Sequence, residues 1–294
     1  MSQETKRIKE LFGYARTLTK EQGLGVMAAR AAGFFKRRFF GKRARYLPAK
    51  KTLEAQRAEA AQSAANWPTI SILTPLYNTP PRFLQQFLDS VQAQTAPNWQ
   101  LVLVDASDSA HAEPGRLAQE RAAQDSRILY RKIGNGGIAA NTNAAAALAG
   151  GDYLALADHD DMLAPHAGFC MSKALAETGA DFAYSDEALF EKTPRRPRVG
   201  HFKPDYAPEY LMAVNYICHL AVFRRSLYEA VGGERPACDG AQDHDLFLRL
   251  IDEMQRRDPA AKPLHIPQVL YYWRVHAAST SGGPAAKPYV EAAA

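Results

Sequence analysis

The sequence predicts an α/β fold with a mainly parallel central sheet, helices on both faces of that sheet, and a basic helical leader in front of it. Strand-like apolar runs alternate with segments of helical spacing between residues 69 and 157, in the order βαβαβαβ. Parallel strands need a crossover connection, usually a helix, so this alternation indicates a parallel sheet. The chain has 294 residues and is 47% hydrophobic and 10% aromatic, which is enough to build a large core.

Each element follows from its local pattern. Apolar, β-rich runs predict strands at 69–76, 100–105, 128–133 and 153–157, and helical spacing predicts helices at 83–94, 116–124 and 141–148. A looser pattern then predicts strands at 181–184, 219–223 and 264–273, helices at 208–214, 226–231 and 243–253, and a basic, proline-rich loop at 191–200. The pattern from residue 287 predicts the start of a further helix, so we expect the chain to be part of a longer protein.

Composition divides the chain into a basic helical leader and linker at 1–66 and a globular domain at 67–294. The net charge is +5, and its positive excess is concentrated in the leader. Residues 30–51 interleave aromatic and basic side chains, a mixture that can lie on an anionic membrane surface. Docking of this segment on the domain as an ordinary helix is an equally good interpretation. A nucleic-acid partner is not expected, because no recognised binding module follows the basic segment.

Cysteine usage and hydropathy bound the cellular setting. The three cysteines are widely spaced and form no Cys-x-x-Cys pair, so neither a disulfide framework nor a structural zinc site is indicated. No apolar run approaches the roughly 20 residues of a membrane-spanning helix. We therefore expect a cytoplasmic protein, peripheral at the inner face of the plasma membrane if residues 30–51 bind lipid.

The most informative stretch is the strand at 153–157, which is followed at once by Asp158, Asp160 and Asp161. Carboxylates held this close repel one another unless a divalent cation or solvent compensates. Oxygen ligands favour Mg²⁺ or Mn²⁺ over Zn²⁺. The alternative is that Asp158 and Asp161 cap the helix that starts near residue 165.

The ends of neighbouring strands repeat this pattern. The strand at 69–76 is followed by Tyr77 and Asn78, and the strand at 100–105 ends in Asp105. In open α/β sheets ligands bind outside the carboxyl ends of the strands. The sequence therefore predicts one polar site along this edge.

These residues, taken in order, resemble the inverting glycosyltransferases of family 2, which have the Rossmann-like GT-A fold. The resemblance extends from about residue 69 to 281 and includes the segments 74–78, 104–105, 135–143, 158–161, 242–246 and 273–276. Residues 184–187 and 201–205 further resemble the bacterial branch that builds surface polysaccharides, including rhamnosyltransferase-like proteins.

The resemblance assigns the donor nucleotide to a group of residues at or after the ends of the first four predicted strands. They are Thr74, Pro75, Tyr77, Asp105, Asn135, Gly137, Asn143 and Asp158. Tyr77 is available for stacking, and a carboxylate at 105 can accept a hydrogen bond from the imide N–H of uracil or thymine, which favours a UDP- or dTDP-linked sugar. For Asp105 the alternative is a turn-capping role, and for Gly137 an ordinary glycine turn before a helix.

The resemblance also implies a metal and a catalytic base. Asp158, Asp160 and His276 are the expected ligands of Mn²⁺ or Mg²⁺, with Asp161 supporting them from behind. Asp243 is the expected base that takes the proton of the acceptor hydroxyl, and Asp245 is the second choice. A structural histidine at 276 and stabilisation of the helix N-terminus by the two aspartates are the alternatives.

The predicted function is metal-dependent, inverting transfer of a sugar from a nucleoside diphosphate to a glycan or lipid-linked glycan acceptor in cell-surface polysaccharide synthesis. A sugar nucleotidyltransferase is an alternative, but it would carry a glycine-rich, basic phosphate loop where residues 78–81 read Asn-Thr-Pro-Pro. A non-catalytic nucleotide- or glycan-binding module of a larger polymer-synthesis protein is the third possibility. The sequence leaves the donor sugar, the acceptor and the linkage open.

Overall fold

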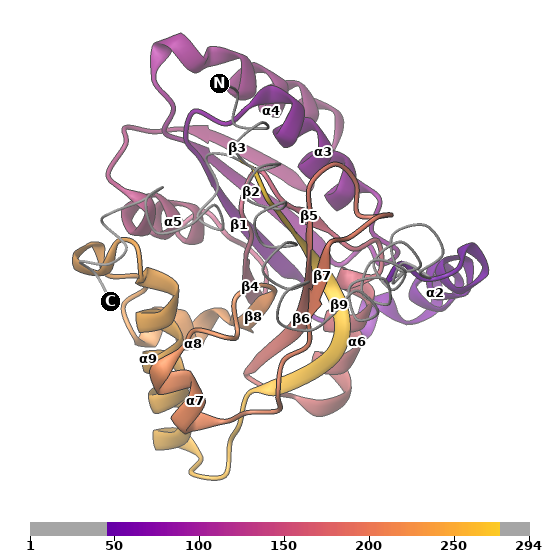
Figure 1. Ribbon diagram of the computed structural model, residues 1–294, viewed down its shortest axis with the longest axis vertical. Coiled ribbons are helices and arrows are strands. Elements are labelled where there is room, and N and C mark those ends of the chain that lie inside the picture. Colours follow the sequence, from indigo (N-terminus) through magenta and orange to yellow (C-terminus); the bar gives the residue numbers. More distant parts are fainter. Residues whose placement is uncertain (1–45, 277–294) are drawn as a thin grey trace, which may run out of the picture. The chain divides into compact units, whose positions relative to one another are not determined.

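A nine-stranded sheet runs through residues 46–276, the part of the chain that the computed structural model describes (Figure 1). One half of it is parallel and ordered β3 (Ile128–Lys132), β2 (Trp99–Asp105), β1 (Ile70–Leu76) and β4 (Tyr153–Leu156). The register places Leu76 of β1 opposite Asp105 of β2, so these strands end together. The predicted parallel sheet is confirmed in this half.

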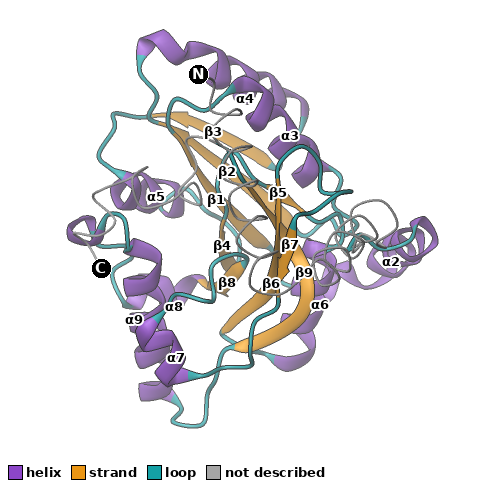
Figure 2. Ribbon diagram, viewed as in Figure 1, coloured by secondary structure: helices purple, strands orange, loops and turns teal. Residues whose placement is uncertain are grey.

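The other half of the sheet is mixed. β8 (Ala221–Arg224) runs antiparallel between β4 and β6 (Phe182–Phe190), and β9 (Leu264–Arg274) runs parallel to β6. Two short strands complete it, β5 (Met162–Leu163) on β9 and β7 (Val199–His201) on β6. The sheet curls, as Figure 2 shows, and β9 brings its last residues back to the loop after β4.

Helices cover both faces of the sheet. One face packs against α3 (Pro81–Gln92), α4 (Ala112–Gln124) and α6 (Ala167–Thr178), and the other against α5 (Ile138–Ala146), α7 (Pro208–Ala213), α8 (Arg225–Ala230) and α9 (Gln242–Arg257). Because side chains alternate along a strand, Ile70 and Ile72 of β1 join the first core and Leu73 joins the second. The predicted two-sided arrangement is confirmed.

The described end of the leader is helical. α2 (Lys50–Ser63) and a short 3₁₀ turn (Ala64–Asn66) occupy the segment expected to be a helix or linker. α2 contacts the domain through Lys173 Nζ, 2.6 Å from Glu59 Oε1, and through Ala60, which packs in a small cluster with Phe169. Most of the basic segment at 30–51 and the helix expected after residue 287 lie outside the described residues. Within them, no helix is long and apolar enough to cross a membrane.

β6 is longer than its sequence pattern predicts, because it continues from the expected end at residue 184 to Phe190. The added residues include two buried acids, Asp186 and Glu187, which break the apolar pattern. Each has partners: Asp186 lies 2.9 Å from His265 Nε2, and Glu187 lies 3.0 Å from His201 Nδ1. Side chains from distant segments thus compensate acids that would not otherwise be buried in a strand.

Candidate active site

Three carboxylates meet directly after β4. Asp158, Asp160 and Asp161 each offer an oxygen, and these oxygens lie within 4.8 Å of one another. β4 runs parallel to β1, and β1 to β2, so the cluster lies at the edge where the parallel strands end. The structure therefore places the acids where the sequence predicts a site.

Asp161 is the buried support of this loop. The Tyr271 hydroxyl donates to its Oδ2 at 2.8 Å, and the backbone N–H of Arg274 donates to its Oδ1 at 2.6 Å. Burial raises the pKa of Asp161 well above its usual value, and the charges of Asp160 and Asp158 raise it further. Both of its oxygens are therefore engaged with β9.

Asp160 is paired with a histidine from the far end of the chain. His276 Nε2 lies 2.7 Å from Asp160 Oδ2, and the His276 ring packs against Phe83 at 5.1 Å. Burial raises the pKa of Asp160, but His159 and His276 outweigh that effect and hold the pKa below its usual value. The Arg274 side chain donates to the Asp160 carbonyl oxygen, which fixes the loop again to β9. Asp160 and His276 are both predicted metal ligands and lie 116 residues apart in the sequence. The fold brings them together.

His219 is a site residue that sequence reasoning missed. Its Nε2 lies 3.6 Å from Asp158 Oδ2, and its ring stacks on Tyr271 at 4.8 Å. Two buried groups fix its backbone: Glu187 Oε2 accepts from the His219 N–H at 2.6 Å, and Lys203 Nζ donates to the His219 carbonyl at 2.5 Å. The available signal was a single histidine beside a cysteine in an otherwise apolar run at 217–223.

Asp243 lies in the first turn of α9, close to the same group. Its Oδ2 is 3.9 Å from Cys218 Sγ and accepts from Gln242 Nε2 at 3.2 Å. Burial raises the pKa of Asp243 to about 6; His219 opposes this shift and Asp158 adds to it. The carboxyl therefore senses both His219 and Asp158, and its pKa suits exchange of a proton near neutral pH.

Asp245, the second choice for the base, is engaged in ion pairs. Arg249 Nη2 lies 2.8 Å from Asp245 Oδ2, and Arg235 binds the same carboxylate. Although burial raises the pKa of Asp245, the hydrogen bonds from Arg235 and Arg249 hold it below its usual value. The Asp245 carboxylate therefore links α9 to the loop before it and has a structural role.

The nucleotide-binding residues expected on β1 and β2 differ in exposure. Tyr77 is 50% exposed, whereas Thr74 is fully buried within β1, next to Pro75. Asp105 is buried and accepts from the Ser107 N–H at 2.9 Å, from the Tyr130 hydroxyl at 2.9 Å and from Lys132 Nζ at 3.1 Å. Burial raises the pKa of Asp105, but hydrogen bonds from Ser107, Lys132 and Tyr130 outweigh this effect and hold the pKa below its usual value.

The nucleotide-binding residues expected after the third strand form hydrogen bonds near the start of α5. Asn135 Oδ1 accepts from the Gly137 N–H at 3.1 Å, and Asn143 binds the backbone of Glu234 through both ends of its amide. Gly137 has φ +92, and a Cβ there would lie 2.3 Å from Asp239 Oδ2, so only glycine fits. Asp239, which the sequence did not single out, accepts from the Ala139 N–H at 3.0 Å and thereby occupies the helix N-terminus.

The model of the family described as glycosyl transferase family 2 matches residues 71–232, more than half of the chain. The chain belongs to this family. Asp243 and His276 lie beyond the matched residues.

Known proteins similar to this family 2 chain include an O-antigen biosynthesis protein, RfbC of Myxococcus xanthus, 36% identical over 238 residues that make up 78% of this chain and 18% of RfbC. The chain spans 18% and 26% of the length of the two curated relatives that are 36% and 37% identical to it. Among solved structures, residues 1–349 of Staphylococcus aureus TarS in complex with UDP-GlcNAc match with a TM-score of 0.56 at 15% identity, covering 71% of this chain and 59% of that one. The mannosyltransferase PcManGT from Pyrobaculum calidifontis, in complex with GDP-Man and Mn²⁺, matches with a TM-score of 0.52 at 18% identity, covering 80% and 69%. These neighbours confirm the GT-A fold.

Proposed function

We propose that this chain is a metal-dependent, inverting glycosyltransferase that moves a sugar from a UDP- or dTDP-linked donor onto a glycan or lipid-linked glycan during surface polysaccharide synthesis. The observation that carries the proposal is that a cluster of carboxylates lies close to a separate carboxyl with a different pKa. Three clustered carboxylates follow β4, and Asp243, a single partly buried carboxyl with a raised pKa, lies close enough to feel the charge of Asp158. The first group suits a cation and the second suits a proton.

The cluster fits Mg²⁺ or Mn²⁺. Asp161 is engaged with Tyr271 and Arg274, which leaves Asp158 and Asp160 to face a cation, with His276 beside Asp160. The repulsion that raises the pKa of Asp161 is the kind that a divalent cation relieves. Such an ion, when bound, would neutralise the diphosphate leaving group. The Mn²⁺ of the structurally similar PcManGT supports this assignment.

The protein's own residues supply the remaining steps. Tyr77, half exposed at the end of β1, offers a stacking face to a pyrimidine, and Asp105, at the end of β2, is the carboxylate that accepts from its imide N–H. Asp243 removes the proton from the acceptor hydroxyl while that oxygen attacks the anomeric carbon from the side opposite the diphosphate. A single displacement of this kind inverts the anomeric centre. The UDP-GlcNAc bound to TarS and the name of RfbC support a nucleotide-sugar donor and a polysaccharide product.

The first test identifies the donor through stability. A panel of nucleoside diphosphate sugars is screened by thermal shift with and without Mn²⁺; a ligand at about 100 times its Kd stabilises the folded state by about 2.7 kcal/mol. We expect a UDP- or dTDP-sugar to raise the melting temperature only when Mn²⁺ is present. Asp160→Asn should remove this dependence on Mn²⁺, while Asp152→Asn, at the opposite end of β4, should keep it. A panel without any metal-dependent shift would contradict the proposal.

The second test concerns chemistry. Asp243→Asn should retain the thermal shift with the selected donor but lose release of the nucleoside diphosphate by about 10³-fold or more, since it cannot accept the proton. Equal loss of donor binding and turnover would argue against Asp243 as the base. A wild-type protein that binds the donor and never turns it over, even slowly with water, would instead be a binding module.

A further inference from the structure

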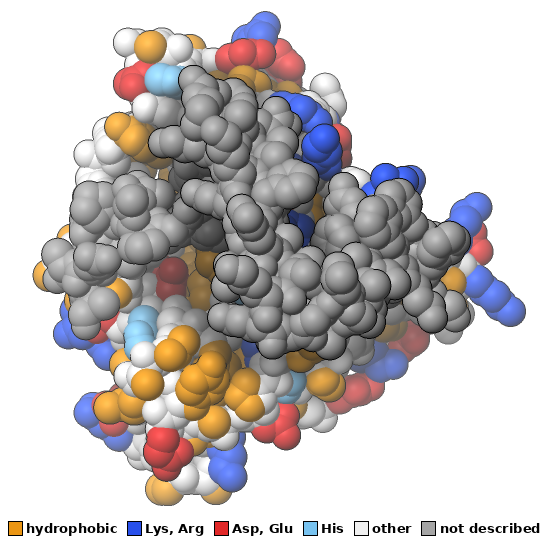
Figure 3. Space-filling view, viewed as in Figure 1, with side chains coloured by type: hydrophobic (Ala, Val, Ile, Leu, Met, Phe, Trp, Pro, Cys, Tyr) orange, Lys and Arg blue, Asp and Glu red, His pale blue; other side chains and the backbone are white. Residues whose placement is uncertain are grey.

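Exposed apolar side chains gather around α7. Of the large hydrophobic residues that are exposed in the described part of the chain, Tyr210, Met212 and Val214 lie together there, with 49%, 71% and 47% of their surface exposed. Figure 3 shows hydrophobic side chains collected over this helix, beside a hollow in which acidic side chains are visible. We call these three residues, with Tyr216 behind them, the α7 patch. Apolar surface concentrated in this way marks a contact site.

The patch is built on a rigid aromatic pair. The ring of Tyr210 stacks on that of Tyr216, with 5.1 Å between the ring centres and 8° between their planes. Tyr216 is buried, accepts a hydrogen bond from the Ala207 N–H at 2.9 Å, and meets Tyr184 edge-on at 5.9 Å. The Tyr210 ring is therefore held in place before any ligand arrives, so binding to it costs little side-chain entropy.

The patch adjoins the segment that carries Asp243. The carbonyl of Leu211, in α7, accepts a hydrogen bond from His244 Nε2 at 2.5 Å, and His244 directly follows Asp243. From the other side, Cys218 Sγ lies 3.9 Å from Asp243 Oδ2, two residues after Tyr216. The chain from α7 to Cys218 thus runs along the carboxylate that we propose as base.

The charge of this segment favours a neutral ligand. Between Pro204 and Phe223 the sequence contains no Lys or Arg, and it contains Asp205 and Glu209. An anionic bilayer binds surfaces that carry Lys and Arg. A pyranose ring is uncharged, has one face covered by C–H groups and carries hydroxyls around its rim. Its apolar face matches a flat, half-exposed tyrosine, and its rim can form hydrogen bonds with water or nearby polar groups.

We propose that the α7 patch is the acceptor subsite, where a pyranose ring of the acceptor glycan stacks on Tyr210 and turns a hydroxyl toward Asp243. This inference rests on the proposed glycosyltransferase function and adds to it the surface that receives the acceptor. Met212 and Val214 extend the contact to the next sugar of the glycan.

Saturation-transfer NMR tests the subsite without knowledge of the natural acceptor. The probe is a mixture of methyl glycosides of glucose, galactose, mannose, rhamnose and N-acetylglucosamine, each at about 10 mM because single sugars bind weakly. We expect saturation to pass from the protein to the C–H protons on one face of the sugar ring. Tyr210→Ala should lower the signal by about fivefold or more, whereas Tyr210→Trp should keep it because the flat ring remains. Phe202→Ala, which removes another exposed aromatic ring, is the matched control and should leave the signal unchanged.

Three outcomes overturn the proposal. Absence of transfer to every sugar with the wild-type protein does so, as does an equal loss in Tyr210→Ala and Phe202→Ala while both remain folded. Sedimentation with phosphatidylglycerol vesicles that depends on Tyr210 and Met212 would also overturn it, in favour of a membrane surface. Binding of the selected UDP- or dTDP-sugar with Mn²⁺ is measured on the same samples. If it persists while the glycosides fail, only the subsite is wrong; if it is absent, the proposed function itself fails.

Discussion

The hydroxyl of Tyr271 joins two ends of the acidic loop: it donates to Asp161 Oδ2 at 2.8 Å and accepts from the Asp158 N–H at 3.0 Å. One buried side chain from β9 therefore fixes the conformation of the segment that carries the proposed metal ligands. The adjacent Tyr272 is equally buried, but its hydroxyl has no hydrogen-bond partner among the described residues. Tyr272 packs in a separate cluster with Phe190, so it is a matched control for Tyr271.

Tyr271→Phe should lower the free energy of unfolding by about 1–3 kcal/mol, because it leaves Asp161 Oδ2 and the Asp158 N–H without their buried hydrogen-bond partner. It should also weaken the Mn²⁺-dependent thermal shift. Tyr272→Phe should change stability by less than about 0.5 kcal/mol, since no hydrogen bond is lost. Urea denaturation of both variants checks this pair. Equal effects of the two changes would show that the hydroxyl of Tyr271 does not support the loop.

Asp243→Asn should stabilise the protein at high pH and not at low pH. The unfolded carboxyl has a pKa of 3.8 and the folded one about 6, so between these values the folded state holds a proton that the unfolded state has lost. In the wild type, the stability that the protonated Asp243 carboxyl contributes is fully present below pH 3.8 and is lost as the pH rises through 6. At pH 8 the wild type carries a partly buried charge that the variant lacks, a difference of up to about 3 kcal/mol. Denaturation of both proteins in EDTA at pH 4 and pH 8 measures it; a difference that does not depend on pH would mean that Asp243 has an ordinary pKa.

Asp245→Asn should separate the two aspartates at the start of α9. It weakens the pairs with Arg235 and Arg249, so the melting temperature should fall by a few degrees, corresponding to about 1–2 kcal/mol. Turnover of the selected donor should remain within about threefold of the wild type, in contrast to the loss in Asp243→Asn. Steady-state kinetics below the melting temperature gives the comparison. A loss as deep as that of Asp243→Asn would reassign the base to Asp245.

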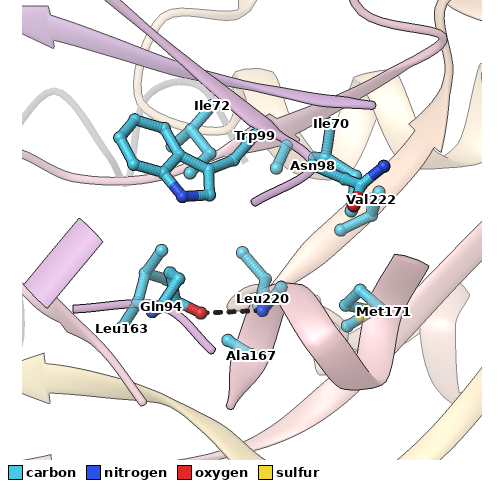
Figure 4. Close-up of a pocket in the computed structure, with 12 residues that line it drawn as sticks. Ile70, Ile72, Gln94, Asn98, Trp99, Leu163, Ala167, Met171, Leu220 and Val222 are labelled. Carbon is cyan, nitrogen blue, oxygen red and sulfur yellow. Dashed lines mark hydrogen bonds between the residues drawn. The ribbon is translucent and has the colours of Figure 1, made fainter. Parts of the chain in front are cut away.

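A small cavity between the sheet and α6 offers a test of packing. Its volume is about 20 Å³, and Figure 4 shows apolar side chains, Val222 among them, pointing toward it. Val222→Ile adds one methyl group and should stabilise the protein by about 0.5–1 kcal/mol. Val102→Ile, on the opposite face where Val102 is fully buried in the second core, should destabilise it by about 1–3 kcal/mol. Differential scanning calorimetry distinguishes them, and a destabilising Val222→Ile would mean that the cavity cannot accept a methyl group.

The sequence alone predicted the parallel half of the sheet and the acids at its edge. These features are local: a run of apolar residues such as 153–156 reports a buried strand, and the residues that follow it must emerge where that strand ends. The positions of Asp158 and Asp160 after β4, and of Asp105 at the end of β2, follow from this rule.

Only the tertiary structure decided which distant groups complete the site. Tyr271 and Arg274, which the sequence did not single out as partners of Asp161, reach the acidic loop from more than 100 residues away, and His219 reaches Asp158 because β8 inserts antiparallel between β4 and β6. Strand order in a mixed sheet depends on pairings between remote segments, and no periodicity within either segment records its partner. Local sequence patterns therefore located the acids, whereas the partners that shift their pKa values and fix their geometry came from the fold.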